Sequence, residues 1–275
     1  MSSSADLRAG LEAVPGCRIG LYARSLEGPQ AGQEVDFFAD EPLPSASLIK
    51  LLVLGELLRR ADAGLSLSRT VALRPEALVG GSEMVSELDP PSRPTLRWLA
   101  QAMITVSDNT ATNALIDLLT FHEINALARY LGLSNTLLGR YMMDTAARGR
   151  GEENYTSARD AAALLAELYK GELLSTDSRN FALGLLLAQR QPPGPPMNFP
   201  SGSRPAYKPG DLDDVRNCAA LSLLPGRTFS IVVLVQGASP HHAYPALDAA
   251  TGEVCRCLAG FRSSPVQPNA ARDGL

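Results

Sequence analysis

The stretch Ser47-Leu48-Ile49-Lys50-Leu51-Leu52-Val53-Leu54 opens the first strongly helical pattern of the chain, with leucines recurring at spacings of three and four. Ser47 occupies the N-cap or first-turn position of this predicted helix. Lys50 follows one helical turn later, so its amine can point to the same place as the Ser47 hydroxyl. A serine hydroxyl is a weak nucleophile until a base takes its proton, and this spacing places Lys50 to do so.

Lysine is scarce in this chain: of the 25 basic residues, three are lysines and 22 are arginines. Two of the three lysines lie in short motifs, Lys50 in Ser-x-x-Lys and Lys208 in Lys208-Pro209-Gly210. An ammonium group can lose its proton when it is buried or close to another cation, whereas a guanidinium cannot. We therefore expect burial and the charge of Lys208 to lower the pKa of Lys50 from its ordinary value of about 10.4.

A third motif, Ser107-Asp108-Asn109, falls at the predicted break between two helices. Taken singly, the three motifs have ordinary explanations as a helix residue, a capping turn and a strand end. Their conjunction predicts an active site for acyl transfer. We expect Ser107 to relay a proton to the leaving nitrogen, Asn109 to hold a substrate amide, and Asp108 to turn inward and fix the loop.

The expected substrate contacts extend along the segment that contains Lys208. The ammonium group of Lys208 can attract a substrate carboxylate. We expect the backbone N–H groups of Ser47 and Asp211 to form an oxyanion hole, with Gly210 between Lys208 and Asp211.

The bulk composition excludes several classes of protein. The chain has 275 residues, of which 45% are hydrophobic, enough for a sizeable core. Its net charge of −4 favours neither nucleic acid nor an anionic membrane as a partner. The sequence has neither a signal-peptide pattern nor an apolar run long enough to span a bilayer. We expect a soluble monomer, cytoplasmic as written, or periplasmic or extracellular if a signal peptide has been removed.

The cysteines and histidines predict neither a metal site nor a cofactor. Four cysteines without a Cys-x-x-Cys pair do not form a disulfide scaffold. Three histidines without a motif partner match no common zinc-ligand spacing.

The remaining sequence alternates predicted strands and helices, with a polar, Gly-rich loop at Arg140 to Asn154. Hydrophobic patterning predicts strands at Cys17–Ala23, Val35–Ala39, Ala206–Lys208, Ala219–Leu224 and Phe229–Gln236. It predicts helices at Thr95–Thr105, Thr110–Leu119, Glu123–Leu131, Ala158–Leu168 and Tyr244–Phe261. These elements predict an α/β fold with one antiparallel sheet flanked by helices.

The chain resembles the class A β-lactamases and their penicillin-binding relatives. The resemblance runs from about Cys17 to Phe261 and extends beyond the three motifs. Its other segments are Thr95-Leu96-Arg97, the run from Met103 through the Ser107-Asp108-Asn109 motif to Asn113, and Phe199-Pro200-Ser201-Gly202. The family implies a sheet domain with an inserted all-α subdomain and a site in the cleft between them. We expect a terminal helix or extension at 1–16, the sheet part at 17–46 and 200–262, the all-α part at 47–199, and a mobile tail at 263–275.

The sequence departs from the family pattern at two positions. In class A β-lactamases, a glutamate two residues after an Ω-loop arginine activates the deacylating water. Aligning that arginine with Arg140 places Met142 at the glutamate position, and a thioether cannot act as a base. Asp144 is one possible substitute carboxylate, and Glu152 and Glu153 are others, although none has the expected spacing.

The second departure is Pro209, which replaces a Thr or Ser whose hydroxyl helps to bind the substrate carboxylate in the family. We therefore expect a serine acyl-enzyme hydrolase acylated by β-lactams or D-Ala-D-Ala-like peptides, with slow deacylation. The alternatives are a true β-lactamase with a different deacylation base, and a non-catalytic β-lactam-binding sensor or pseudoenzyme. In each case, the partner is a small-molecule or peptide acyl donor.

Overall fold

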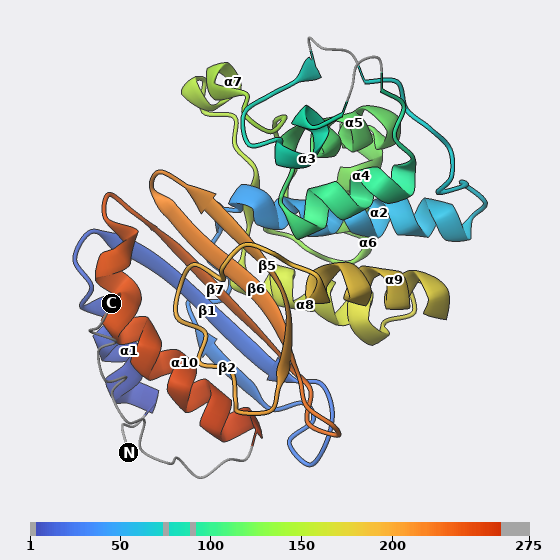
Figure 1. Cartoon of the computed structure of the whole chain (residues 1–275). Coiled ribbons are helices and arrows are strands. Elements are labelled where there is room, and N and C mark those ends of the chain that lie inside the picture. Colours follow the sequence, from blue (N-terminus) through green and yellow to red (C-terminus); the bar gives the residue numbers. More distant parts are fainter. Residues whose placement is uncertain (1–3, 74–76, 89–91, 260–275) are drawn as a thin grey trace, which may run out of the picture.

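A computed structural model describes residues 4–73, 77–88 and 92–259 of the chain. Its centre is a five-stranded antiparallel sheet with the strand order β2-β1-β7-β6-β5 (Figure 1). The strands are β1 (Cys17–Ser25), β2 (Glu34–Phe37), β5 (Arg204–Leu212), β6 (Val215–Leu223) and β7 (Phe229–Gly237). The predicted opening hairpin therefore joins the three later strands in one sheet, as expected.

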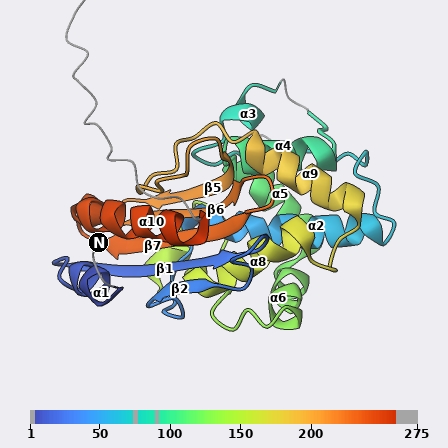
Figure 2. The same cartoon turned by 90° about the horizontal axis from the view of Figure 1, so that it is seen from below.

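Helices cover both faces of the sheet (Figure 2). α1 (Ser4–Glu12) and α10 (Tyr244–Ala259) lie on one face and contact each other. Strand residues pointing to this side, among them Leu21, Ile231 and Val233, share a buried apolar cluster with the two helices. α8 (Ala158–Lys170) covers the other face through contacts with β1, β6 and β7. Two apolar layers thus enclose the sheet, as a sheet with two apolar faces requires.

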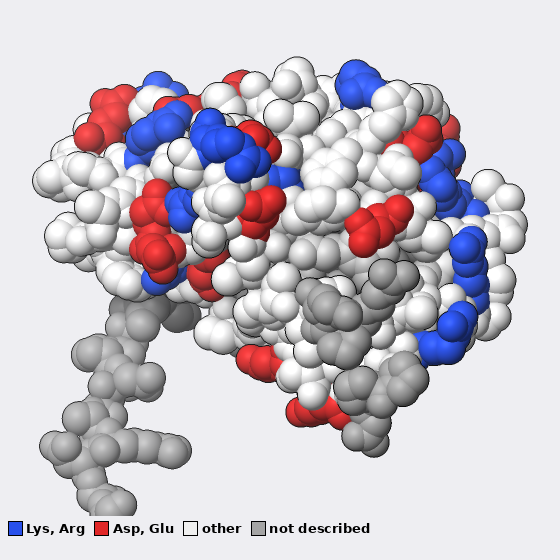
Figure 3. Space-filling model, turned by 90° about the horizontal axis from the view of Figure 1, so that it is seen from above, with Lys and Arg blue, Asp and Glu red and all other residues white. Residues whose placement is uncertain are grey.

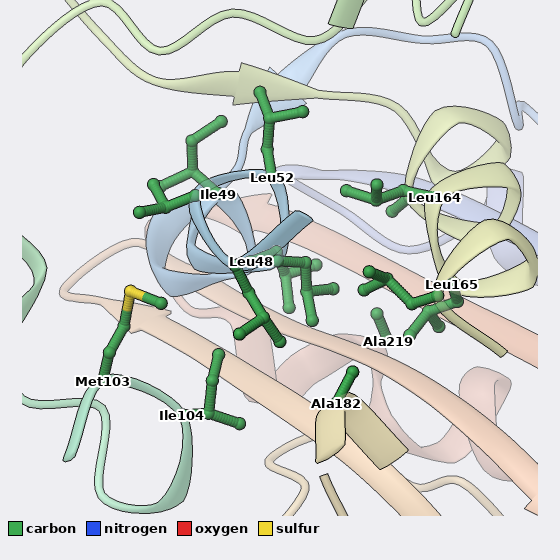
Figure 4. Packing of buried hydrophobic residues seen from close by; sticks show 14 of the residues in the cluster. Leu48, Ile49, Leu52, Met103, Ile104, Leu164, Leu165, Ala182 and Ala219 are labelled. Atoms are coloured by element: carbon green, nitrogen blue, oxygen red, sulfur yellow. The ribbon is translucent and has the colours of Figure 1, made fainter. Parts of the chain in front are cut away.

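The second part of the molecule is a group of helices built around α2 (Lys50–Asp62). Every residue from Lys50 to Leu58 is buried, so this helix runs through the core with neighbours on all sides. Leu48, Ile49 and Leu52 lie close to side chains from other helices and from the sheet (Figure 4). The surrounding helices are α3 (Glu83–Ser86), α4 (Leu96–Thr105), α5 (Asn109–Leu119), α6 (Phe121–Tyr130) and α9 (Thr176–Leu187).

Strand β5 forms one edge of the sheet and faces the helical part. Leu212 and Val215 close the two-residue turn to β6 and so form a hydrogen-bonded pair. By the alternation of an antiparallel ladder, Pro209 and Asp211 then point their backbone groups away from β6. A proline is tolerated there because that position needs no N–H. The outer edge of β5 contacts the 3-10 turn η1 (Ala46–Ile49) that precedes α2.

Several elements differ from the sequence expectation. The helical pattern at Ser47 starts as the 3-10 turn η1, and the α-helix begins at Lys50. The loop predicted at 140–154 contains a short helix, α7 (Thr145–Gly149). Helix α9 was not predicted, and its mixture of apolar and polar residues has little amphipathic pattern. The expected tail at 263–275 lies outside the described residues, and the proposed domain boundaries remain a prediction.

Charged side chains on the face seen in Figure 3 are mixed in sign, with basic and acidic groups close together. Several charged residues of the molecule form ion pairs, such as Arg148 with Asp214 and Arg150 with Glu152. Among the described residues, no helix has the length and apolar character that crossing a membrane requires.

Candidate active site

Ser47 lies in the turn η1, where it faces the edge of β5. The preceding residue, Ala46, has a φ of 46°, in the left-handed region that costs free energy for a non-glycine residue. Ser47 is partly exposed, whereas its neighbours Ala46 and Leu48 are buried. Within the described part of the chain, neither its hydroxyl nor its backbone N–H has a hydrogen-bond partner. Ser47 is therefore open to an incoming ligand.

Lys50 begins α2 and is fully buried. Its Nζ lies 2.5 Å from the carbonyl oxygen of Ser107 and 2.7 Å from Oδ1 of Asn109. A third contact, 3.1 Å long, joins Nζ to the hydroxyl oxygen of Ser107. The start of α2 is thus tied to the Ser107-Asp108-Asn109 turn by one side chain.

Lys208 reaches the same turn from β5. It is also fully buried, and its Nζ donates to Ser107 Oγ at 3.0 Å and to the carbonyl of Pro209 at 2.9 Å. The bond from Lys208 to the Pro209 carbonyl agrees with the β5–β6 ladder, in which the Pro209 backbone groups point away from β6. The structure therefore brings three of the expected residues, Lys50, Ser107 and Lys208, into one hydrogen-bonded chain.

The two lysines are in an environment that opposes their charge. Burial lowers the pKa of Lys50 well below its ordinary value, and the nearby charge of Lys208 lowers it further. Burial also lowers the pKa of Lys208, to about 7. An amine with such a pKa can act as a base near neutral pH, which an ordinary surface lysine cannot.

Gly210 allows β5 to approach the nucleophile closely. A Cβ atom at this position would lie 3.0 Å from the backbone nitrogen of Ser47 and 3.1 Å from the carbonyl oxygen of Ser45. Asp211 follows, and its N–H points out of the sheet on the same edge. The N–H groups of Ser47 and Asp211, for which the described residues show no hydrogen-bond partner, therefore both belong to the place where β5 approaches the turn η1.

Asp108 turns inward, as predicted. It is fully buried, caps α5 by accepting from the N–H of Ala111, and accepts from the N–H of Val85. The amide of Asn109 accepts from Lys50 and donates to the carbonyl of Gly80 at 2.8 Å. Since an amide nitrogen carries two hydrogens, one N–H of Asn109 remains for a ligand.

Met142 lies beside α5 and not in solvent. Its side chain is 6% exposed and belongs to the apolar core. Its backbone N–H and carbonyl both pair with the amide of Asn113, at 2.8 and 3.1 Å. Asn113 stands one helical turn after Asn109, so this pairing fixes the 140–144 segment relative to the site. Asn113 ends the segment that resembles the family, but nothing in the sequence indicated this role apart from its spacing of four residues from Asn109.

The other carboxylates of this loop are engaged elsewhere. Asp144 caps α7 by accepting from the N–H of Ala147 at 2.8 Å. Glu153 is buried between Arg140 and Arg148, and Arg148 continues to Asp214 at the end of the β5–β6 hairpin. Glu152 pairs with Arg150 near the surface. None of these carboxylates contacts Ser47, Lys50 or Lys208 in the described residues.

A sheet enclosed by helices, with Ser47 on the turn before the buried helix that Lys50 begins, is the arrangement typical of serine hydrolases of the β-lactamase type. The chain belongs to the β-lactamase enzyme family, whose sequence model matches residues 3–258.

Curated relatives agree with this assignment. The β-lactamase AST-1 of Nocardia asteroides is 32% identical over 257 residues, which cover 89% of this chain and 79% of the relative. A β-lactamase of Streptomyces albus G is 28% identical, and the match covers 94% of this chain and 84% of the relative.

Solved structures show the same fold. The structure of PBP-A has a TM-score of 0.84 at 26% identity and covers 94% of this chain and 96% of its own. A mutant of PBP-A, solved as an acyl-enzyme complex with penicillin G, has a TM-score of 0.83 at 26% identity, with coverages of 94% and 96%. A class A β-lactamase from Mycobacterium abscessus has a TM-score of 0.83 at 25% identity, with coverages of 94% and 100%.

Proposed function

We propose that Ser47 is the nucleophile, that β-lactams or D-Ala-D-Ala-like peptides acylate it, and that the acyl-enzyme is hydrolysed slowly. The observation that carries this proposal is the set of contacts around Lys50. Its Nζ faces two carbonyl oxygens, of Ser107 and Asn109, which only accept hydrogen bonds. A neutral amine has two N–H groups for these two oxygens, and its lone pair is left for a hydroxyl.

The lowered pKa of Lys50 supports this neutral state. The lone pair can then accept a proton from Ser47, which lies one turn away, or from Ser107, whose Oγ is 3.1 Å from Nζ. Lys208 donates to the same Ser107 oxygen and orients its hydroxyl. A proton that Lys50 takes from Ser47 can pass on through Ser107 to a leaving group.

In the acylation step, Ser47 Oγ forms a bond to the carbonyl carbon of the donor, and the C–N bond of the donor breaks. The proton of Ser47 passes to Lys50, and Ser107 delivers a proton to the leaving nitrogen. The N–H groups of Ser47 and Asp211 stabilise the negative oxygen of the tetrahedral intermediate. The remaining N–H of Asn109 holds an amide carbonyl of the donor.

Slow deacylation is proposed from the position of Met142. Hydrolysis of the acyl-enzyme requires a base for the attacking water, and the buried thioether of Met142 cannot supply one. Asp144 is a less suitable base, because its carboxylate already caps α7. The similarity to PBP-A, of which a mutant is described as an acyl-enzyme complex with penicillin G, supports acylation of this chain by penicillins.

We also propose that the protein acts as a monomer on a small molecule or peptide and not on nucleic acid. Its net charge of −4 supports the second point. The compartment is proposed to be the cytoplasm for the chain as written, or the periplasm or extracellular space for a secreted form. Size-exclusion chromatography with light scattering tests the monomer directly.

Incubation with a fluorescent penicillin, followed by mass spectrometry over time, tests the function. The expected result is a single adduct on Ser47 that persists for many minutes, and no adduct in Ser47→Ala. An adduct on Ser45 or Ser107 contradicts the assignment of the nucleophile. An adduct that forms and disappears within seconds favours a true β-lactamase, in line with the names of the curated relatives. No adduct at all favours a non-catalytic binding protein.

A further inference from the structure

Asn217 on β6 is fully buried, and its side-chain amide joins segments that are distant in the sequence. Its Nδ2 donates to the carbonyl oxygen of Pro44 at 2.9 Å, and its Oδ1 accepts from the N–H of Val235 at 3.1 Å. A carbonyl only accepts and an N–H only donates, so these two partners fix the direction of the amide. Asn217 thus fastens the end of β3 (Leu43–Pro44) to the central sheet.

Asn217 holds the chain next to the place where β5 approaches the turn η1. In the β5–β6 ladder it pairs directly with Gly210, so the two residues share one face of the sheet. On that face, a Cβ atom at Gly210 would lie 3.0 Å from the backbone nitrogen of Ser47 and 3.1 Å from the carbonyl oxygen of Ser45. The bond to Pro44 therefore anchors the chain three residues before Ser47.

The residues between Pro44 and Ser47 carry the backbone strain of the site. Ser45 is fully buried, and its N–H donates to the carbonyl oxygen of Asn154 at 2.7 Å. Ala46 follows with its left-handed φ of 46°, a conformation that persists in a non-glycine residue only when the surrounding contacts hold it. The backbone angles of Ala46 also set the direction of the next N–H, which belongs to Ser47.

We propose that Asn217 is a positioning residue for the acylation of Ser47. Its bond to Pro44 holds Ala46 in the left-handed conformation, and this conformation directs the N–H of Ser47 into the oxyanion hole. Without the bond, the turn relaxes toward a negative φ at Ala46, and the N–H of Ser47 turns away from the oxyanion. This inference rests on the proposed function of Ser47 and adds a residue that acts on the nucleophile from the far side of β5.

A pair of substitutions tests the link between Asn217 and Ala46. We expect Asn217→Ala to slow acylation by a fluorescent penicillin by about tenfold to a hundredfold, as for a misplaced oxyanion-hole donor. Glycine adopts a positive φ as readily as a negative one, so Ala46→Gly removes the strain. Added to Asn217→Ala, it should raise the rate by about tenfold, the factor that matches the cost of a left-handed alanine. In the presence of Asn217 the same change should raise the rate much less.

Asn125→Ala is the matched control. The amide of Asn125 makes the same two kinds of bond, donating to the carbonyl of Leu138 at 2.9 Å and accepting from its N–H at 2.8 Å. Its loss should lower the free energy of unfolding, measured with urea, but leave the acylation rate of Ser47 unchanged. This control separates a general loss of stability from a loss of position at the nucleophile.

Asn217→Asp gives a second readout that does not depend on the folding of Asn217→Ala. A neutral carboxyl group has the size of the amide and can both accept from Val235 and donate to Pro44, whereas a carboxylate cannot donate. The acylation rate of Asn217→Asp, divided by that of the unmodified protein at the same pH, should therefore fall as the pH rises. Circular dichroism at each pH shows that the variant remains folded.

Three results overturn the proposal. They are acylation of folded Asn217→Ala at the rate of the unmodified protein, an equal effect of Ala46→Gly with and without Asn217, and a rate ratio of folded Asn217→Asp that does not change with pH. In each case Ser47 of the unmodified protein is still acylated, so the proposed function stands. If the unmodified protein is not acylated at Ser47, the proposed function itself fails, and the role of Asn217 fails with it.

Discussion

Lys50 and Lys208 share one partner atom: their Nζ nitrogens lie 3.1 and 3.0 Å from Oγ of Ser107. The two amines are therefore no more than about 6 Å apart, a distance at which like charges oppose each other's protonation. Both side chains are fully buried, which opposes protonation further. One lysine is thus suited to act as the base and the other to orient Ser107 between them.

Replacement of Lys50 tests its role as the base. We expect Lys50→Met to slow acylation of Ser47 by about a hundredfold or more, because the proton of Ser47 then has no acceptor. Lys50→Arg should not restore the rate, since a guanidinium keeps its proton. The rate is measured by mass spectrometry of the adduct, with circular dichroism as the control for folding. If Ser47 of folded Lys50→Met were acylated at the rate of the unmodified protein, Lys50 would be excluded as the base.

The pH dependence of stability tests the burial of Lys208. Its pKa is lowered to about 7 in the folded protein, whereas an unfolded lysine titrates near 10.4. Between these values the unfolded state binds more protons, so the free energy of unfolding should rise with pH. Urea unfolding from pH 7 to 9 measures this rise. We expect Lys208→Met to reduce its slope and Lys170→Met, at an exposed position, to preserve it. Equal slopes in the unmodified protein and Lys208→Met would contradict this account.

Introducing a carboxylate at Met142 tests the cause of slow deacylation. We expect Met142→Glu to shorten the lifetime of the penicillin adduct by a factor between about ten and a thousand, on the order of the usual gain from a general base. Because Met142 is buried in the core, the same change should lower the free energy of unfolding by about 1–3 kcal/mol.

The neighbouring substitution Met143→Glu is the control. Met143 is 49% exposed, so the added charge remains in water and should change neither lifetime nor stability greatly. Rapid penicillin hydrolysis by the unmodified protein would show that another group activates the water, and the proposed lack of a base would be wrong.

Gly210→Ala tests the narrow space between β5 and Ser47. The added methyl group would lie 3.0 Å from the Ser47 nitrogen and 3.1 Å from the Ser45 carbonyl oxygen, so the strand or the turn must shift. We expect the acylation rate to fall by about tenfold to a thousandfold, as for loss of one oxyanion-hole donor. Gly184→Ala in α9, where a Cβ meets nothing within 4 Å, is the matched control. Unchanged acylation in folded Gly210→Ala would show that the oxyanion does not bind between these elements.

The local sequence was sufficient for several elements near the site. The short apolar runs of the strands predicted the hairpin and the three later strands, because a strand covered on both faces is apolar along most of its length. Asp108 was predicted to turn inward, and it does so because a short acid before a helix caps the free N–H groups of the first turn. Such features depend on neighbours within a few residues.

The sequence by itself determined the family, the segments of the chain that form the strands, and the residue types that meet at the site. Only the tertiary structure decided which atoms meet: Lys50 and Lys208 on Ser107, Asn113 on Met142, and Gly210 against Ser47. These pairs are 29 to 163 residues apart along the chain. The loop carboxylate of Glu153 likewise looks free in the sequence, and only the fold places it between Arg140 and Arg148. The physical reason is that burial and long-range contacts, which set pKa values and exposure, arise only when distant segments pack together.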